Sequence, residues 1–239
     1  MAQTARKREA SGAKDVRRRL SGAQRRDRIV QQAAEVFADE GFAATTRELA
    51  KRLGVTQALL YKFYPSKQAL IDAVYETVFQ GRWDPGWTDL LADGSIPVGE
   101  RMTAFYIAYH ERMDGVAMKL FVRAGLAGMA LPGARGARLT DQIFAPITAA
   151  LRQLAGLPPL EQRPMIRGER ELCLQLHGSI VFLAIRRHVY RMRMPASVDD
   201  VIRMYVATFV EGAPATLRRL HADEESTLRV TQLRPAADR

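Results

Sequence analysis

The sequence is poor in the features that mark secreted and membrane proteins. It contains one cysteine, Cys173, so no disulfide can form within the chain, as expected in a reducing cytoplasm. Its longest apolar run, residues 173–185, is interrupted by Gln175, His177 and Ser179 and is too short to span a bilayer. The basic N-terminal segment lacks the apolar stretch of a secretory signal. We therefore expect a soluble cytoplasmic protein with no membrane partner.

Signatures of catalysis are also missing. The chain has no P-loop, no G-x-S-x-G, no H-E-x-x-H and no cluster of spaced metal ligands, and it holds only four histidines. Cys173 and His177 lie four residues apart and could face one metal ion together on a helix. Two such ligands are too few for a site, so a structural role is favoured for both. The sequence predicts no enzyme activity, no cofactor and no metal.

What the sequence does have is positive charge, concentrated at one end. The formal net charge is +10, and residues 1–28 hold ten Lys and Arg against three acidic residues. Residues 68–239 are nearly balanced, with 21 basic and 19 acidic residues. A polyanion is the natural partner of such a distribution, because Lys and Arg that neutralise phosphates release condensed counterions. A genomic bias towards arginine would act everywhere, so the uneven distribution favours nucleic acid.

Apolar residues recur at helical spacing along most of the chain, and no segment alternates as a strand does. Residues 1–22 lack this periodicity and are predicted to be a disordered basic arm. Residues 84–99 are rich in Gly, Pro and Asp, which predicts a loop with at most one short turn. A flexible tail is expected at residues 222–239. The sequence predicts an all-α fold of about nine helices, the later ones at about 66–82, 99–113, 115–130, 140–155, 168–192 and 197–220.

Residues 23–66 are expected to form a domain of three short helices. The second has Thr46 as its predicted N-cap, and the third lies in the stretch GVTQALLYKFYPSK, residues 54–67. Two short helices joined by a tight turn that contains Gly are the helix-turn-helix signature. Thr56 would cap the third helix and Ser66 the next one. The apolar positions Val55, Leu60 and Tyr64 would pack inward, so the polar face would be left for DNA.

The span from Arg26 to about Val78 resembles the DNA-binding domain of TetR-type (TetR/AcrR) transcriptional regulators. The resemblance rests on AAEVF, the GF pair, TTRELA, GVTQALLY and the terminal PSK, in that order and spacing. The remaining chain resembles the family only in architecture. The resemblance implies a sequence-specific DNA-binding regulator, usually a repressor, that is released from a palindromic operator by a small-molecule ligand.

The resemblance also implies particular DNA contacts. Gln57 and Ala58 fall where family members read base edges, and Gln can pair with adenine through N6 and N7. Phe63 stands where a His or Tyr often donates to phosphate, and Lys62 can substitute electrostatically. Phosphate contacts are implied for Thr46, Arg47, Thr56, Tyr61 and Lys67.

Simpler alternatives exist for two of these residues and for the neighbouring Leu59. Tyr61 could pack beneath its helix, and Lys67 could be a solvated charge. Leu59 could be partly core rather than a contact for a thymine methyl group.

A single helix-turn-helix domain, or head, makes few contacts with bases, so a two-fold dimer is expected. The best interface candidates are the helices at about 168–192 and 197–220, which would form a four-helix bundle with their mates. Residues 67–221 would sense an effector of unknown identity and dimerise. The expected pocket residues are Phe105, Tyr109, His110, Met113, Phe121, Phe144 and His177.

The mechanism expected from the sequence is a population shift. A ligand that prefers one arrangement of the bundle would tilt the helix after Ser66 and change the spacing of the two heads. A non-specific DNA-binding protein of the nucleoid type is the alternative, because the basic arm would serve it too. Such a protein would not need the long aromatic-rich bundle.

Overall fold

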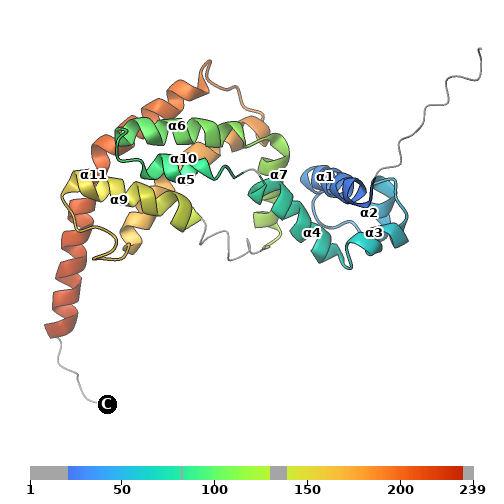
Figure 1. Ribbon diagram of the computed structural model, residues 1–239, viewed down its shortest axis with the longest axis horizontal. Coiled ribbons are helices and arrows are strands. Elements are labelled where there is room, and N and C mark those ends of the chain that lie inside the picture. The colour runs from blue at the N-terminus through green and yellow to red at the C-terminus, as the bar shows by residue number, and fades with distance from the viewer. Residues whose placement is uncertain (1–20, 82, 130–138, 234–239) are drawn as a thin grey trace, which may run out of the picture.

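The computed structural model describes residues 21–81, 83–129 and 139–233, and every regular element in these ranges is helical (Figure 1). The predicted all-α class is therefore confirmed. Residues 1–20 of the predicted basic arm and residues 234–239 lie outside the described ranges. The last two residues of the predicted arm are not irregular, because Ser21 is the N-cap and Gly22 the first residue of α1. In chain order the elements are α1 (Gly22–Glu40), α2 (Thr46–Arg52), α3 (Gln57–Phe63), α4 (Lys67–Tyr75), the π-helical segment η2 (Glu76–Gln80), α5 (Gly86–Ala92), α6 (Val98–Glu111), α7 (Gly115–Leu126), the π-helical segment η3 (Thr140–Phe144), α9 (Ala145–Ala155), α10 (Arg167–His188) and α11 (Val198–Leu233).

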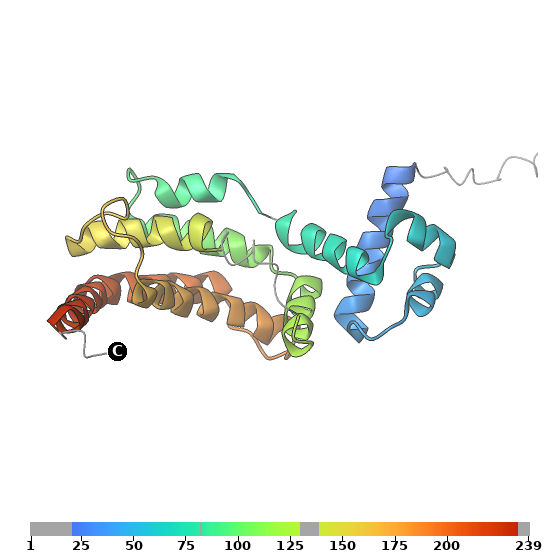
Figure 2. The ribbon, with the colours of Figure 1, turned by 90° about the horizontal axis from the view of Figure 1, so that it is seen from below.

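The helices form two bodies that follow one another along the longest axis of the molecule (Figure 1). Helices α1, α2 and α3 with the start of α4 make a small head, and α5 to α11 make a larger bundle (Figure 1). Figure 2 shows that α4 and η2 lead from the head towards the bundle. A second connection is direct, because α1 of the head packs against α7 of the bundle.

Side-chain caps fix the starts of the head helices. Ser66 accepts a hydrogen bond from the Ala69 amide at 3.0 Å, so its predicted role as the N-cap of α4 is confirmed. The prediction that Thr46 caps α2 was wrong, because the cap is Thr45. Glu48 lies three residues after Thr45 and bonds back to its amide at 2.7 Å, which closes a capping box on Thr45. Thr46 is therefore the first residue inside the helix.

Two segments expected to be irregular are helical. The predicted loop at 84–99 contains α5, whose Trp87 and Leu91 lie four residues apart and are both buried against neighbouring helices. Tertiary burial thus outweighs the turn-forming residues around it. The last helix was expected to end near Leu220, yet α11 continues to Leu233. After residue 221 the sequence contains neither Gly nor Pro until Pro235, so no strong stop signal interrupts the helix.

A buried ionic cluster joins α9, α10 and α11. Arg152 donates to both carboxylate oxygens of Glu169 at 2.7 Å and to three backbone carbonyls of the α9–α10 connection. The imidazole of His221 lies 2.9 Å from the same carboxylate. Burial alone would raise the pKa of Glu169, but the hydrogen bonds from Arg152 and His221 lower it below its usual value. The Arg152–Glu169 ion pair and its hydrogen bonds therefore link three helices and the α9–α10 connection.

We expect Glu169→Gln to lower the free energy of unfolding by about 3–5 kcal/mol at pH 7, because it leaves Arg152 buried without its counter-charge. Urea unfolding followed by circular dichroism measures this loss. A carboxyl group with a lowered pKa in the folded state stabilises the fold only while it is ionised there. The difference from wild type should therefore shrink as the pH falls below 4.5, the ordinary pKa of Glu.

Glu171→Gln is the matched control, because Glu171 is exposed on the same helix. Its effect should stay within about 0.5 kcal/mol of wild type. Equal losses from the two variants would contradict a special role for the buried cluster.

Candidate nucleic-acid interface

Helix α3 is held to the head by one face. Leu60 is 2% exposed and Tyr64 is 3% exposed, and the Tyr64 hydroxyl donates to the backbone carbonyl of Arg26 at 3.4 Å. The guanidinium of Arg26 lies over the Tyr64 ring, 5.6 Å from its centroid. Thr56 caps the helix as predicted, because its hydroxyl accepts from the Leu59 amide at 3.1 Å. The other residues of α3 are exposed, except for Leu59 and Phe63, which are half-buried.

The predicted DNA contacts lie on α3 and its N-cap, at the start of α2 and at the first residue of α4. Tyr61 is 43% exposed, which excludes the alternative that it packs beneath its helix. Thr46 and Lys67 are half-buried. The other exposed members of the predicted set are Arg47, Thr56, Gln57, Ala58 and Lys62.

Three members of this set also bond to one another across α2 and α3. The Thr46 hydroxyl lies 3.1 Å from the Tyr61 hydroxyl. The side-chain amide of Gln57 donates to the same Thr46 oxygen at 3.4 Å. The polar surface is thus partly organised before any DNA is bound.

Three residues at or near this surface are only partly exposed: Leu59, Phe63 and Lys67. The Lys67 ammonium donates to the backbone carbonyl of Phe42, so a phosphate contact would have to use its remaining N–H groups. Phe63 packs against the core of the protein. Leu59 is half-buried, so both residues expose less apolar surface than a purely DNA-facing role would need.

The bundle contacts the head at the C-terminal end of α1. Arg123 of α7 donates to the carbonyl oxygens of Ala38, at 2.7 Å, and of Asp39, while Lys119 donates to the Asp39 carboxylate at 2.6 Å. Cations are favourable there because the last carbonyls of a helix lack intrahelical partners. The hydrogen bond from Lys119 lowers the pKa of Asp39 below its usual value.

Gly41 completes this contact. It follows α1 with φ of 81°, and an added Cβ would lie 3.3 Å from the Arg123 guanidinium. We call the contact of Arg123 and Lys119 with the end of α1 the α1–α7 latch.

Four of the seven predicted pocket residues meet inside the bundle. His177 of α10 is surrounded by rings, with centroid distances of 5.3 Å to Tyr109 and 5.7 Å to Phe144. Phe105 stacks on Tyr109 at 5.4 Å. Tyr106, which the pocket prediction omitted, lies 6.1 Å from His177, and its hydroxyl is fully buried with no hydrogen-bond partner among the described residues. Leaving a buried hydroxyl without any hydrogen bond costs about 1–3 kcal/mol.

The other predicted pocket residues are spread over α6, its C-terminal end and α7. His110 and Met113 are buried, and Phe121 is half-buried on α7. Burial lowers the pKa of His110, and the nearby charge of Arg187 acts in the same direction. Cys173 lies 3.4 Å from the Thr148 hydroxyl, and burial raises the pKa of its thiol to about 11. No three His, Cys, Asp or Glu side chains of the described residues gather as metal ligands would.

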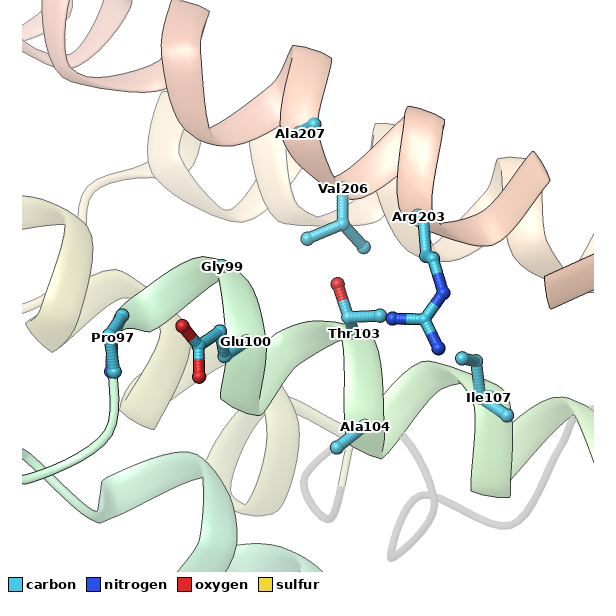
Figure 3. A pocket seen from close by; sticks show the side chains of 9 residues that line it. All are labelled: Pro97, Gly99, Glu100, Thr103, Ala104, Ile107, Arg203, Val206 and Ala207. Carbon is cyan, nitrogen blue, oxygen red and sulfur yellow. The ribbon is translucent and has the colours of Figure 1, made fainter. Parts of the chain in front are cut away.

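A groove of about 620 Å³ lies elsewhere, between α6 and α11. Its walls carry Glu100 and Thr103 of α6 and Arg203 of α11, whose guanidinium reaches towards Thr103 and Ile107 (Figure 3). None of the seven predicted pocket residues lines this groove. Sequence periodicity could not predict this groove, because its two walls are about a hundred residues apart. Within the described ranges, no helix combines the length and the hydrophobicity that a membrane span requires.

Comparison with known proteins identifies the head. Residues 29–74 match the model of the family described as bacterial regulatory proteins, tetR family. This part of the chain is a TetR-family domain. A TetR-family transcriptional regulator from Streptomyces coelicolor superposes with a TM-score of 0.54 and 17% sequence identity, over 90% of this chain and 92% of that one. At this identity the likeness shows that the fold is shared.

Curated relatives match only part of the chain. The HTH-type transcriptional repressor KstR2 of Mycolicibacterium smegmatis is 31% identical over 93 residues, which cover 38% of this chain and 44% of KstR2. The nucleoid occlusion factor SlmA of Aliivibrio fischeri is 44% identical over 61 residues, or 23% of this chain and 31% of SlmA. The chain thus spans less than half the length of these curated relatives.

We expect Arg123→Gln to loosen the TetR-family domain from the bundle, because it removes the guanidinium from the last carbonyls of α1. Spin labels at Lys51→Cys on α2 and Ala149→Cys on α9 report the distance between head and bundle. Cys173 is buried and should not take the label. Dilution with unlabelled protein isolates distances within one chain. The distribution should be narrow in the parent and clearly broader in the variant.

Arg112→Gln is the control, because it removes a cation that pairs with Asp84 at 3.2 Å, away from α1. It should leave the distance distribution narrow. An unchanged distribution in Arg123→Gln would show that the latch does not hold the head.

Proposed function

We propose that the protein is a sequence-specific DNA-binding regulator of transcription that binds a palindromic operator as a homodimer. The observation that carries the proposal is the exposed polar surface of α3, anchored through Leu60 and Tyr64 in a TetR-family domain. A helix presented in this way fits the major groove, where side chains reach base edges. Residues 23–66 would form the reading domain and residues 67–221 the sensing and dimerisation domain.

An unpartnered apolar face supports the dimer. On α10, Leu174 and Phe182 are exposed on the same side as Gly178, where an added Cβ would meet only open space. On α11, Met204 is 56% exposed. Covering these residues with the same surface of a second copy would give the isologous four-helix interface expected from the sequence. The two heads would then have to lie about 34–36 Å apart to read half-sites one helical turn apart.

Release by a small molecule is the regulatory part of the proposal. The ring cluster around His177 and the unpaired hydroxyl of Tyr106 suit a largely apolar effector that offers one hydrogen-bonding group. Repression follows if the unliganded dimer holds the heads at operator spacing. A hundredfold loss of operator affinity needs about 2.7 kcal/mol of preference between two bundle arrangements. The contacts of α4 and η2 with α1 and α7, together with the α1–α7 latch, offer two routes from bundle to head.

Footprinting of genomic fragments with the full-length protein tests the proposal. We expect protection of a discrete palindrome next to a promoter. Lys62→Ala should weaken binding to all sequences alike and reduce the salt dependence by about one phosphate contact, because Lys62 is an exposed cation beside the reading surface. Arg219→Ala, which removes an exposed cation from α11, is the control and should bind as wild type does.

Equal retention of all fragments would contradict sequence-specific regulation. It would favour the second candidate, a non-specific DNA-binding protein of the nucleoid type. The charge of residues 1–28 is the observation that favours this candidate.

The dimer has its own test. Phe182→Arg should convert a dimer into a monomer at micromolar concentration in sedimentation equilibrium, because it places a charge in the centre of the apolar face. Leu154→Arg changes an equally exposed apolar residue on α9 and should leave the dimer intact. A monomeric wild-type protein, or equal behaviour of both variants, would contradict this interface.

A further inference from the structure

The hydroxyl of Thr46 lies between two side chains with different expected tasks. Gln57 is placed to read a base and Tyr61 to meet a phosphate, and both lie within hydrogen-bond distance of the Thr46 oxygen. We propose that Thr46 is a positioning residue that orients Gln57, and thereby sets base preference without touching a base. The inference rests on the proposed function and names a residue that determines the specificity of the same surface.

The hydrogen-bond inventory gives the contact a direction. A side-chain amide nitrogen can only donate, so Thr46 accepts from Gln57. Thr46 then has one proton left, and the Tyr61 oxygen 3.1 Å away can accept it. In this arrangement the proton of Tyr61 points outward, where a DNA phosphate can accept it. A phosphate beside Tyr61 would therefore favour the arrangement in which Gln57 donates to Thr46 and Thr46 donates to Tyr61.

The same hydrogen bond sets the orientation of the Gln57 side-chain amide. One amide proton goes to Thr46, while the second proton and the carbonyl oxygen remain free for a base. A donor next to an acceptor matches adenine, which presents N7 as acceptor and the N6 amino group as donor in the major groove. An amide without this bond can exchange its oxygen and nitrogen by rotation about its last torsion. Its preference for adenine would then fall.

Thr46 is suited to hold this position. It is the first residue of α2 and lies within the Thr45–Glu48 capping box, which fixes the backbone there. The threonine side chain has few rotamers because it is branched at Cβ. Helix α2 also packs against α3, so the distance between Thr46 and Gln57 does not depend on a loose loop.

The experiment is selection of binding sites from a random duplex library by the full-length protein, followed by sequencing. Wild type should enrich a motif with adenine preferred at one position of each half-site. Gln57→Ala should abolish that preference. Thr46→Val has nearly the same shape but no hydroxyl, and it should reduce the preference at the same position by roughly fivefold or more. Thr46→Ser keeps the hydroxyl and should restore it.

Tyr61→Phe separates positioning from simple phosphate binding. It should weaken binding without changing the enriched motif, because it removes the Tyr61 hydroxyl but leaves the Thr46 oxygen to accept from Gln57. The inference is overturned if Thr46→Val lowers affinity but keeps the wild-type motif, or if Gln57→Ala leaves every position unchanged. Thermal unfolding of each variant checks that the head is folded, and the Thr46→Ser result distinguishes lost packing from a lost hydroxyl. Failure of wild-type protein to enrich any motif would instead refute the proposed function itself.

Discussion

The one-sided burial of α3 is the constraint on which the rest of the structure depends. A helix of seven residues is not stable by itself in water, so its position is set by what it packs against. Leu60 and Tyr64 supply that packing, and Arg26 holds the Tyr64 ring from α1. Because one face is fully used, Gln57, the residues around it and the start of α2 are left as one polar surface. Everything proposed about DNA recognition uses this division.

The same logic extends to the bundle, which can influence the head only through the contacts that join them. Helix α4 and η2 form one connection, and the latch from Arg123 and Lys119 to the end of α1 forms the other. The Arg152–Glu169 cluster keeps α9, α10 and α11 together, so a change in the ring cluster around His177 can reach several helices at once. Rigid elements connected at few points transmit small shifts better than a compliant body would.

Local patterns were the part of the structure that the sequence predicted well. The caps at Thr56 and Ser66 and the inward positions Leu60 and Tyr64 depend on neighbours a few residues away, and such signals are visible in one chain. The wrong prediction of Thr46 as a cap shows that these signals depend on exact spacing. Thr45 is the cap because Glu48 lies three residues after it and can bond back to its amide. Contacts between residues far apart in the sequence could not be predicted from it. Arg152 and His221 meet Glu169 from 17 and 52 residues away, and no periodicity marks them. The bond between Gln57 and Thr46 likewise depends on how α2 and α3 pack.

Site-specific photo-crosslinking to duplex DNA tests the central claim most directly, because it reports which surface of the protein lies against the double helix. A photoreactive phenylalanine analogue would replace Ala58 on α3 in one protein and Arg219 on α11 in another, both exposed positions. The account predicts crosslinks from position 58 to bases of the bound duplex and none from position 219. Crosslinks from position 219 without any from position 58 would contradict it, because DNA would then be bound by the bundle rather than by α3.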